Sequence, residues 1–205
     1  MWLLGTVLAL SAVTASTASA EEDSAAVLAS VAKSRSALST LQVSFTQERE
    51  LSLLSSKVTS KGELLLVRPD RMRWRLEAPD DATYWVSKEG VAYRTKDGSG
   101  KVSAGQAGGL AALLDDVLLV VGGDLDKIKT RYDLSATKEG ERITVTLLPR
   151  LERVRKLVKK LQITLDPDGL PRTLLMEEPE GDSTKIVFGE PKKNAKIDPA
   201  VLTAP

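Results

Sequence analysis

The sequence predicts a mainly β fold: one antiparallel meander of about ten or eleven short strands, with one helix before it and another inserted within it. Three observations predict this fold. Apolar and polar residues alternate in many short runs from Leu41 onward. Turn-forming sequences separate these runs at near-regular spacing. Two other segments carry apolar residues at helical spacing instead. A sheet of that many strands usually curls or closes.

Residues 1–20 have the features of a secretory signal peptide. They contain no charged residue, an apolar run extends from Trp2 to about Val13, and Ala18-Ser19-Ala20 forms an A-x-A cleavage site. A membrane anchor is the alternative, but the apolar run is short and rich in Ser, Thr and Ala. We therefore expect a cleaved signal over residues 1–20 and a single domain over residues 21–205.

Two segments are predicted to be helical. Residues 21–40 carry an apolar stripe, with Lys33 and Arg35 assigned to its far side; the stripe consists of Val27, Leu28, Val31, Ala32, Leu38 and Leu41. Residues 106–121 carry a second stripe, flanked by the glycine pairs 108–109 and 122–123; it consists of Leu110, Leu113, Leu114, Val117, Leu118 and Val121. So many leucines and valines will not face water, so the inserted helix must cover an apolar surface.

The strands are expected between recognisable turns. Their predicted ranges are 41–47, 57–67, 72–77, 83–87, 91–95, 100–104, 130–138, 143–148, 161–166, 172–178 and 184–188. Residues 150–160 form a basic cluster of six cationic residues and one Glu, interpreted as a helical turn that leads into a strand near Val158. This cluster is either a solvated face or a contact surface for an acidic partner or anionic headgroups.

The composition excludes several classes of function. The chain has no cysteine and no histidine, which removes disulfides, thiolate metal sites and the commonest general base. A net charge of +1 gives no basic field for nucleic acid. No nucleophile elbow, phosphate-binding loop or metal-spaced carboxylate cluster is present, and residues 166–169 are interpreted as a hairpin turn rather than a calcium loop. We expect no enzyme activity, no cofactor and no metal.

Several motifs occur in a characteristic order. Phe45-Thr46-Gln47 is followed by Gly62 with Leu64 and Leu66, then by the segment from Arg68-Pro69 to Trp74, and then by Pro79. These match the F-x-Q, G-x-L and R-P-x-x-x-x-W pattern of the LolA family of outer-membrane lipoprotein carriers. A later D-x-x-G turn and Ile197-Asp198-Pro199 also match, so residues 25–200 resemble that family, although Met72 stands where the family often has an aromatic residue.

The resemblance implies a half-open barrel of eleven antiparallel strands, with the helices forming a lid over an apolar cavity. It implies a monomeric periplasmic carrier that binds the acyl chains of lipoproteins and ferries them from the inner to the outer membrane. The implied partners are acylated lipoproteins, an inner-membrane lipoprotein-releasing ABC transporter and an outer-membrane LolB-like receptor. A regulatory or sensor module of the RseB type, or a carrier of another lipid, is the alternative, because related proteins share the fold.

The inward faces of the strands and of the inserted helix supply the candidate cavity residues. The candidates are Leu41, Val43, Phe45, Leu64, Leu66, Met72, Trp74, Leu76, Trp85, Tyr93, Ile143, Val145, Ile163 and Leu174 on the strands, and Leu110, Leu113, Leu114, Val117 and Leu118 on the lid. A filled core made of the same residues is the alternative. The resemblance further implies that Arg68 acts as a latch, by donating hydrogen bonds to carbonyls at helix ends.

Overall fold

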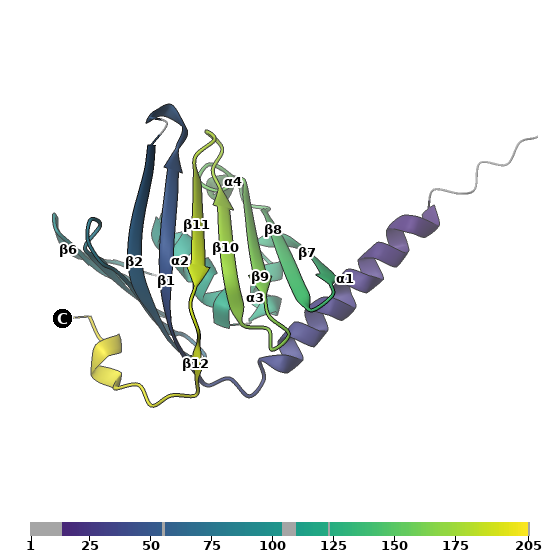
Figure 1. Ribbon diagram of the computed structural model, residues 1–205, viewed down its shortest axis with the longest axis horizontal. Coiled ribbons are helices and arrows are strands. Elements are labelled where there is room, and N and C mark those ends of the chain that lie inside the picture. The colour runs from purple at the N-terminus through teal and green to yellow at the C-terminus, as the bar shows by residue number, and fades with distance from the viewer. Residues whose placement is uncertain (1–13, 55, 104–109, 123, 205) are drawn as a thin grey trace, which may run out of the picture.

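The computed structural model describes residues 14–54, 56–103, 110–122 and 124–204, and the side chains of 14–22, 54 and 110–113 lie outside this description (Figure 1). The helices are α1 (Thr14–Ser34), α2 (Leu110–Gly122), α3 (Leu125–Lys129) and α4 (Glu152–Arg155), with the 3₁₀ turns η1 (Ser52–Leu54) and η2 (Pro199–Leu202). The strands are β1 (Thr40–Leu51), β2 (Ser56–Val67), β3 (Arg71–Leu76), β4 (Ala82–Ser87), β5 (Gly90–Thr95), β6 (Gly98–Ser103), β7 (Tyr132–Glu139), β8 (Arg142–Pro149), β9 (Lys160–Leu165), β10 (Pro171–Glu177), β11 (Ser183–Phe188) and β12 (Lys192–Lys193).

All the strands belong to one antiparallel sheet that curls without closing. Its order is β6-β5-β4-β3-β2-β1-β11-β10-β9-β8-β7, and the short β12 pairs with the start of β1. Each half of the chain forms one wing, and the wings meet where β1 pairs with β11. The predicted class, a mainly β, half-open antiparallel meander of about eleven strands with an N-terminal and an inserted helix, is confirmed.

The local predictions differ from the structure in a few places. α1 begins at Thr14, inside the segment assigned to the signal peptide, whereas residues 1–13 lie outside the described residues. The short α3 was not predicted, because its Leu125 and Ile128 are too few to form a stripe. The basic segment forms the helical turn α4 as predicted, and β9 then starts at Lys160 rather than near Val158.

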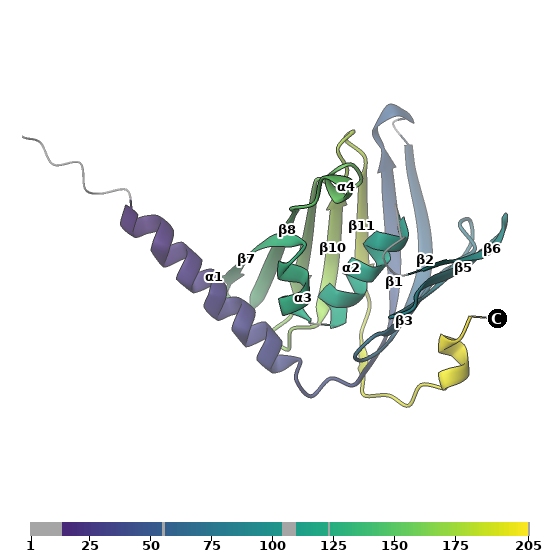
Figure 2. The same ribbon diagram turned by 180° about the vertical axis from the view of Figure 1, so that it is seen from behind.

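The inserted helices lie across the hollow of the sheet. Strands β6 and β7 are the two edges of the sheet, so the segment between them must cross from one edge to the other. In Figure 2 α2 and α3 lie in front of the curved sheet, on its concave side. α1 runs along the edge strand β7, where the backbone N–H of Ala136 donates to Ser24 Oγ at 2.8 Å. This helix therefore covers an edge that would otherwise expose unpaired backbone groups.

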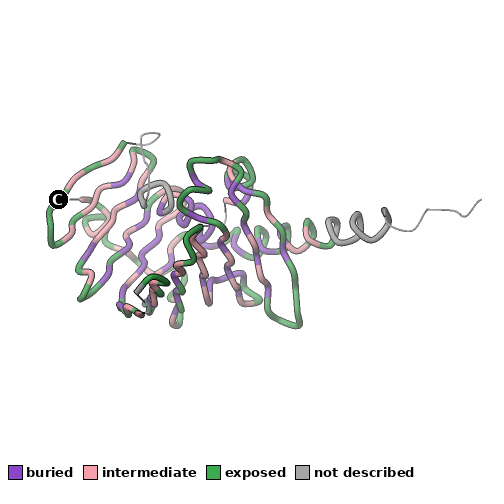
Figure 3. The backbone as a smooth tube through the Cα atoms, turned by 90° about the horizontal axis from the view of Figure 1, so that it is seen from above, coloured by how far each residue is buried: buried purple, intermediate pink, exposed green. Residues whose placement is uncertain are grey.

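The core lies between the concave face and the helices. Buried residues alternate with exposed ones along the strands, as the tube in Figure 3 shows. At its centre the Phe45 and Trp74 rings have centroids 4.3 Å apart, and Phe188 meets Phe45 edge-on at 6.2 Å. Gly62 makes this cluster possible, because a Cβ there would lie 2.4 Å from the Phe45 ring. The F-x-Q, G-x-L and R-P-x-x-x-x-W motifs thus meet in one aromatic centre.

The convex face carries a small apolar patch of its own. Trp85 pairs across the sheet with Arg73, whereas its neighbour Tyr84 pairs with Trp74 on the concave face. The Trp85 Nε1–H donates to the carbonyl of Val201 at 3.2 Å, which ties η2 to the outside of the sheet. The prediction that Trp85 faces the cavity is therefore wrong, because a strand period of two places adjacent residues on opposite faces.

Among the residues that the structure describes, every helix is too short or too polar to cross a membrane.

Candidate binding cavity and its lid

The concave side of the sheet contains a cavity of about 430 Å³, between the two wings and beneath α2. Part of its wall is mostly apolar and consists of Trp74, Leu76, Ala82, Tyr84, Leu114, Val117, Leu161, Leu174, Met176 and Ile186. Its remaining wall is mostly polar and consists of Gln47, Arg49, Pro79, Asp80, Thr95, Lys96, Asp97, Glu178 and Thr184. Lys96 and Asp97 are exposed, so the polar side opens to solvent. The cavity therefore has the form of an amphiphile site, with an apolar interior and a polar mouth.

The predicted site residues divide between this cavity and a filled core. Trp74, Leu76, Leu174, Leu114 and Val117 line the cavity. Ten others are buried in the continuous core without lining it: Leu41, Val43, Phe45, Leu64, Leu66, Met72, Leu118, Ile143, Val145 and Ile163. Tyr93 is half-buried and pairs with Tyr84 on the concave face, whereas the side chains of Leu110 and Leu113 lie outside the described residues. The expected cavity and the alternative, a filled core, are thus both found in part, because five of the predicted residues line a hollow and ten lie in packed core.

Several lining residues were missed, although the sequence carried a signal for two of them. Gln47 and Arg49 continue the two-residue period of Val43 and Phe45 along β1, so they lie on the same concave face. Their polarity argued against an inward position. Tyr84 was missed because a short run such as Thr83–Ser87 does not show which of its two faces turns inward.

Arg68 holds the end of α1 against the sheet. Its guanidinium Nη1 donates to the carbonyls of Arg35 at 2.7 Å and of Leu38 at 3.2 Å. Its backbone N–H donates to the carbonyl of Ser39 at 2.9 Å. Arg68 therefore bonds to the carbonyls where α1 ends, as the family resemblance implies for a latch. No hydrogen bond joins Arg68 to the described residues of α2.

Arg35 makes the contact with α2 that Arg68 does not make. Its side chain is only 2% exposed, and its Nη1 donates to the carbonyls of Val120 at 2.6 Å and Val121 at 3.3 Å, at the C-terminal end of α2. Its Nε donates to the carbonyl of Gly169 in the β9–β10 turn. Helix ends leave such carbonyls unpaired and partially negative. The assignment of Arg35 to the solvent side of its helix is therefore wrong.

Burial makes Arg35 an unusual cation. Loss of hydration and, to a smaller extent, the nearby positive charge of Arg68 lower the pKa of its guanidinium to about 10, although Asp166 opposes both effects. The group is still a cation at neutral pH. Its Nη2 is buried without a hydrogen-bond partner among the described residues. The closed position of α2 therefore depends on a charged contact with an incomplete set of acceptors.

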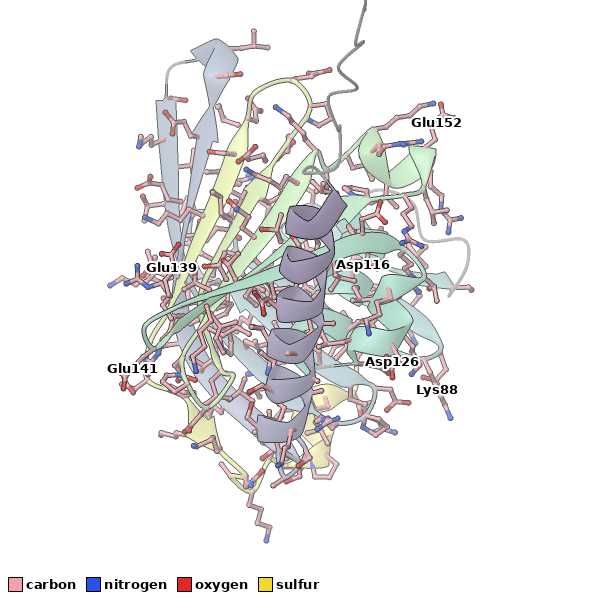
Figure 4. All side chains as sticks on the ribbon, turned by 90° about the vertical axis from the view of Figure 1, so that its right-hand side faces the viewer. Lys88, Asp116, Asp126, Glu139, Glu141 and Glu152 are labelled. Carbon is pink, nitrogen blue, oxygen red and sulfur yellow. The ribbon has the colours of Figure 1, made fainter. Side chains whose placement is uncertain are left out.

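A second polar contact holds the middle of α2. Asp116 is 1% exposed and accepts hydrogen bonds from Tyr132 Oη at 2.6 Å and from Arg131, which also bonds to Asp115 at 2.8 Å. Figure 4 shows Asp116 in the interior behind α1, whereas Glu139 and Glu141 lie at the outer end of the β7–β8 hairpin. Burial raises the pKa of the Asp116 carboxyl, although the bonds from Tyr132 and Arg131 oppose this effect.

Among the residues that the structure describes, no group of three or more Asp, Glu, His or Cys side chains is arranged to hold a metal ion.

The fold and the cavity agree with the comparison with known families. The family model described as "Outer membrane lipoprotein carrier protein LolA" matches residues 36–204. The chain belongs to this family. Among curated proteins, none matches the sequence.

Several solved structures are similar to this chain at low sequence identity, and the first of them shows the same fold. A DUF1329 family protein from Desulfovibrio piger has a TM-score of 0.53 at 9% identity, covering 88% of this chain and 97% of that chain. A LolA superfamily protein from Nitrosomonas europaea has a TM-score of 0.47 at 8% identity, covering 89% and 98%. MucB of Pseudomonas aeruginosa, in complex with MucA, has a TM-score of 0.46 at 20% identity, covering 89% of this chain and 61% of that chain.

Proposed function

We propose that this protein is a periplasmic carrier that binds the acyl chains of lipoproteins in its cavity and ferries them from the inner to the outer membrane. The observation that supports this most is a partly apolar cavity on the concave face, covered by a helix that packs apolar side chains onto the core and is fixed in place by a few polar contacts. Leu114 and Val117 of α2 form part of the cavity wall, so moving α2 would open it. The proposal assigns the protein no catalytic step.

The energetics of acyl chains explain why such a cavity is needed. Burying one methylene group is worth about 0.8 kcal/mol, so exposing a chain of about 16 carbons to water costs on the order of 12 kcal/mol. A carrier must offset this cost with apolar surface of its own. It must also cover that surface when empty, because a large exposed apolar patch promotes aggregation. The closed position of α2 serves the second requirement.

The size of the cavity indicates that loading changes the structure. A volume of about 430 Å³ is at the lower end of the range of about 300–1,000 Å³ that is typical of small-molecule sites. A lipoprotein with three acyl chains needs more room than this. The helix α2 is therefore expected to move outward during loading, which requires two sets of bonds to break: those from Arg35 to its C-terminal end, and those from Tyr132 and Arg131 to its own Asp116.

The carrier proposal includes three kinds of partner. Acylated lipoproteins are the cargo, an inner-membrane ABC transporter supplies the energy for release from the bilayer, and a LolB-like receptor accepts the cargo at the outer membrane. Mass spectrometry of material that co-purifies from the periplasm tests the cargo. We expect acylated peptides. Free lipid would indicate a carrier of another lipid, and the absence of any acyl compound would contradict the proposal.

A variant in the lid tests the cavity itself. Leu114 is 5% exposed and lines the cavity, whereas Leu148 on β8 is 48% exposed. We expect Leu114→Gln to weaken binding of the fluorescent apolar probe 1-N-phenylnaphthylamine about tenfold, because it replaces apolar wall with an amide. The control Leu148→Gln should leave binding unchanged. Equal affinities in both variants would show that the probe does not enter this cavity.

A further inference from the structure

The cavity has a polar band within its wall, and this band has no role in holding a hydrocarbon chain. Along the concave face of β1 the residues change from apolar to polar, with Val43 and Phe45 followed by Gln47 and Arg49. Gln47 is only 8% exposed and lines the cavity. It lies two residues beyond Phe45, which is about 7 Å along a strand. The band therefore lies between the aromatic centre of the core and the solvent-facing mouth.

A second polar side chain stands beside Gln47. In the register of β1 with β11, Gln47 pairs with Ile186 and Arg49 pairs with Thr184, so Gln47 and Thr184 are diagonal neighbours on one face. Thr184 is 6% exposed and also lines the cavity. Among the described residues, neither the Gln47 amide nor the Thr184 hydroxyl has a hydrogen-bond partner within the protein. Neither group is among the buried polar atoms shut off from solvent, so both reach the cavity surface, where water or a ligand can bond to them.

Arg49 completes the band without giving it a net charge. Its Nη2 donates to Asp80 at 2.6 Å, and Asp80 also accepts a hydrogen bond from Ser60. The Nε of Arg49 is buried with no acceptor among the described residues. Because Asp80 neutralises the guanidinium, the band presents hydrogen-bond donors rather than free positive charge. Such a site suits an uncharged acceptor better than a carboxylate or a phosphate.

A ligand in the cavity displaces the water that can bond to these two groups, and leaving such a group unpaired costs about 1–3 kcal/mol. A ligand that brings an acceptor to this level therefore gains more than its hydrocarbon burial alone. Apolar lining residues lie beside the band on neighbouring strands, with Ile186 opposite Gln47 and Leu174 opposite Ile186, and these suit the hydrocarbon. The ligand that fits both parts has an alkyl chain joined to a carbonyl group.

We propose that Gln47 and Thr184 form a subsite for the ester or amide carbonyl that links an acyl chain to its headgroup. The amide N–H of Gln47 and the hydroxyl of Thr184 donate to the carbonyl oxygen, which has two lone pairs. The chain then lies in the apolar part and the headgroup at the mouth near Glu178. This subsite makes the cavity selective for acylated compounds over other hydrocarbons, and it rests on the proposed function, in which the cavity holds acyl chains.

The test uses two ligands that differ in a single carbonyl. They are a palmitoyl lysophosphatidylcholine, with an ester, and its hexadecyl analogue, with an ether at the same position. Displacement of 1-N-phenylnaphthylamine reports the affinity of each. The wild-type protein should bind the ester about 3- to 10-fold more tightly than the ether, because the ester carbonyl accepts hydrogen bonds from both donors and the ether offers no carbonyl.

Variants assign this preference to the two residues. Gln47→Met keeps the shape of the side chain and removes the amide, and Thr184→Val removes the hydroxyl. Each should lower the preference for the ester to about one- to twofold and leave the affinity for the ether nearly unchanged. Gln42→Met is the matched control, because Gln42 lies on the opposite face of β1 and donates to Glu63 at 2.8 Å. It should keep the wild-type preference.

The outcomes separate the subsite from the carrier function. If the wild-type protein binds ester and ether equally, the subsite does not exist, although the cavity still takes hydrocarbon. A preference that survives in both variants would overturn the assignment to Gln47 and Thr184. If neither ligand displaces the probe from the wild-type protein, the cavity does not take acyl chains, and the proposed function fails together with the subsite.

Discussion

Replacing Arg35 by Met should release α2 from the sheet without unfolding the strands. The substitution removes donors from the carbonyls of Val120, Val121 and Gly169. A hydrogen bond from a charged group contributes about 1.5–3 kcal/mol, so two good bonds contribute about 3–6 kcal/mol. Burial works against them, because lowering the pKa of Arg35 to about 10 corresponds to a cost of about 3 kcal/mol.

The net loss expected for Arg35→Met is therefore about 2 kcal/mol, which increases the population with a detached α2 by about 30-fold. Hydrogen exchange of the α2 amides, residues 114–122, measures this population, with the amides of β9 as an internal reference. Lys33→Met is the control, because Lys33 is exposed on the same helix. Unchanged protection of α2 would refute the latch, and an equal loss in α2 and β9 would show that Arg35 stabilises the whole fold instead.

Three further predictions concern other contacts. Arg68→Leu should slow the transfer of bound lipid to acceptor vesicles. The substitution removes the bonds of Arg68 to the end of α1, which disfavours the closed, empty state relative to the loaded state. A transfer rate equal to that of the wild type would contradict this. Gly62→Ala should lower the free energy of unfolding, measured in urea, by about 1–3 kcal/mol, because the added Cβ would collide with the Phe45 ring. Gly122→Ala is the control and should be nearly neutral, because a Cβ at that position has no atom within 4 Å. Burial raises the pKa of Asp116, so the folded state binds its proton more tightly than the unfolded state. Stability from this group is therefore present at low pH and is lost as the pH rises through the raised value. The stability of the wild type relative to Asp116→Asn should increase as the pH falls toward the ordinary pKa of an aspartate, about 4, and a difference independent of pH would disprove this.

The sequence predicted the strands well because their signal is local. Alternation and turn residues depend on neighbours in the chain, and the eleven main strands lie close to the ranges expected from them. The face of a short strand is harder to predict, since the alternation around Trp85 fits either orientation. Only pairing with β3 decides it, because Tyr84 lies opposite Trp74.

Arg35 shows a different limit. A charged residue on a helix normally faces water, and nothing nearby in the sequence indicates otherwise. One acceptor is the carbonyl of Val120 at the end of α2, which lies 85 positions further along the chain. Another is the carbonyl of Gly169 in the β9–β10 turn, which lies 134 positions further along. Only the tertiary fold brings these carbonyls together. The cavity could not be predicted from the pattern alone for a similar reason, because alternation identifies the inward face of a strand without showing whether side chains fill the space that it faces.

The connection between the edge strands has a mechanical consequence. Strands β6 and β7 are consecutive in the chain yet form opposite edges of the sheet, and α2 and α3 belong to the segment that connects them. Because α2 packs against β4 and β5 in one wing and α3 packs against β7 in the other, spreading the wings must also shift these helices over the sheet. A partner that binds the edge strand β6 would therefore affect loading without touching the residues that line the cavity.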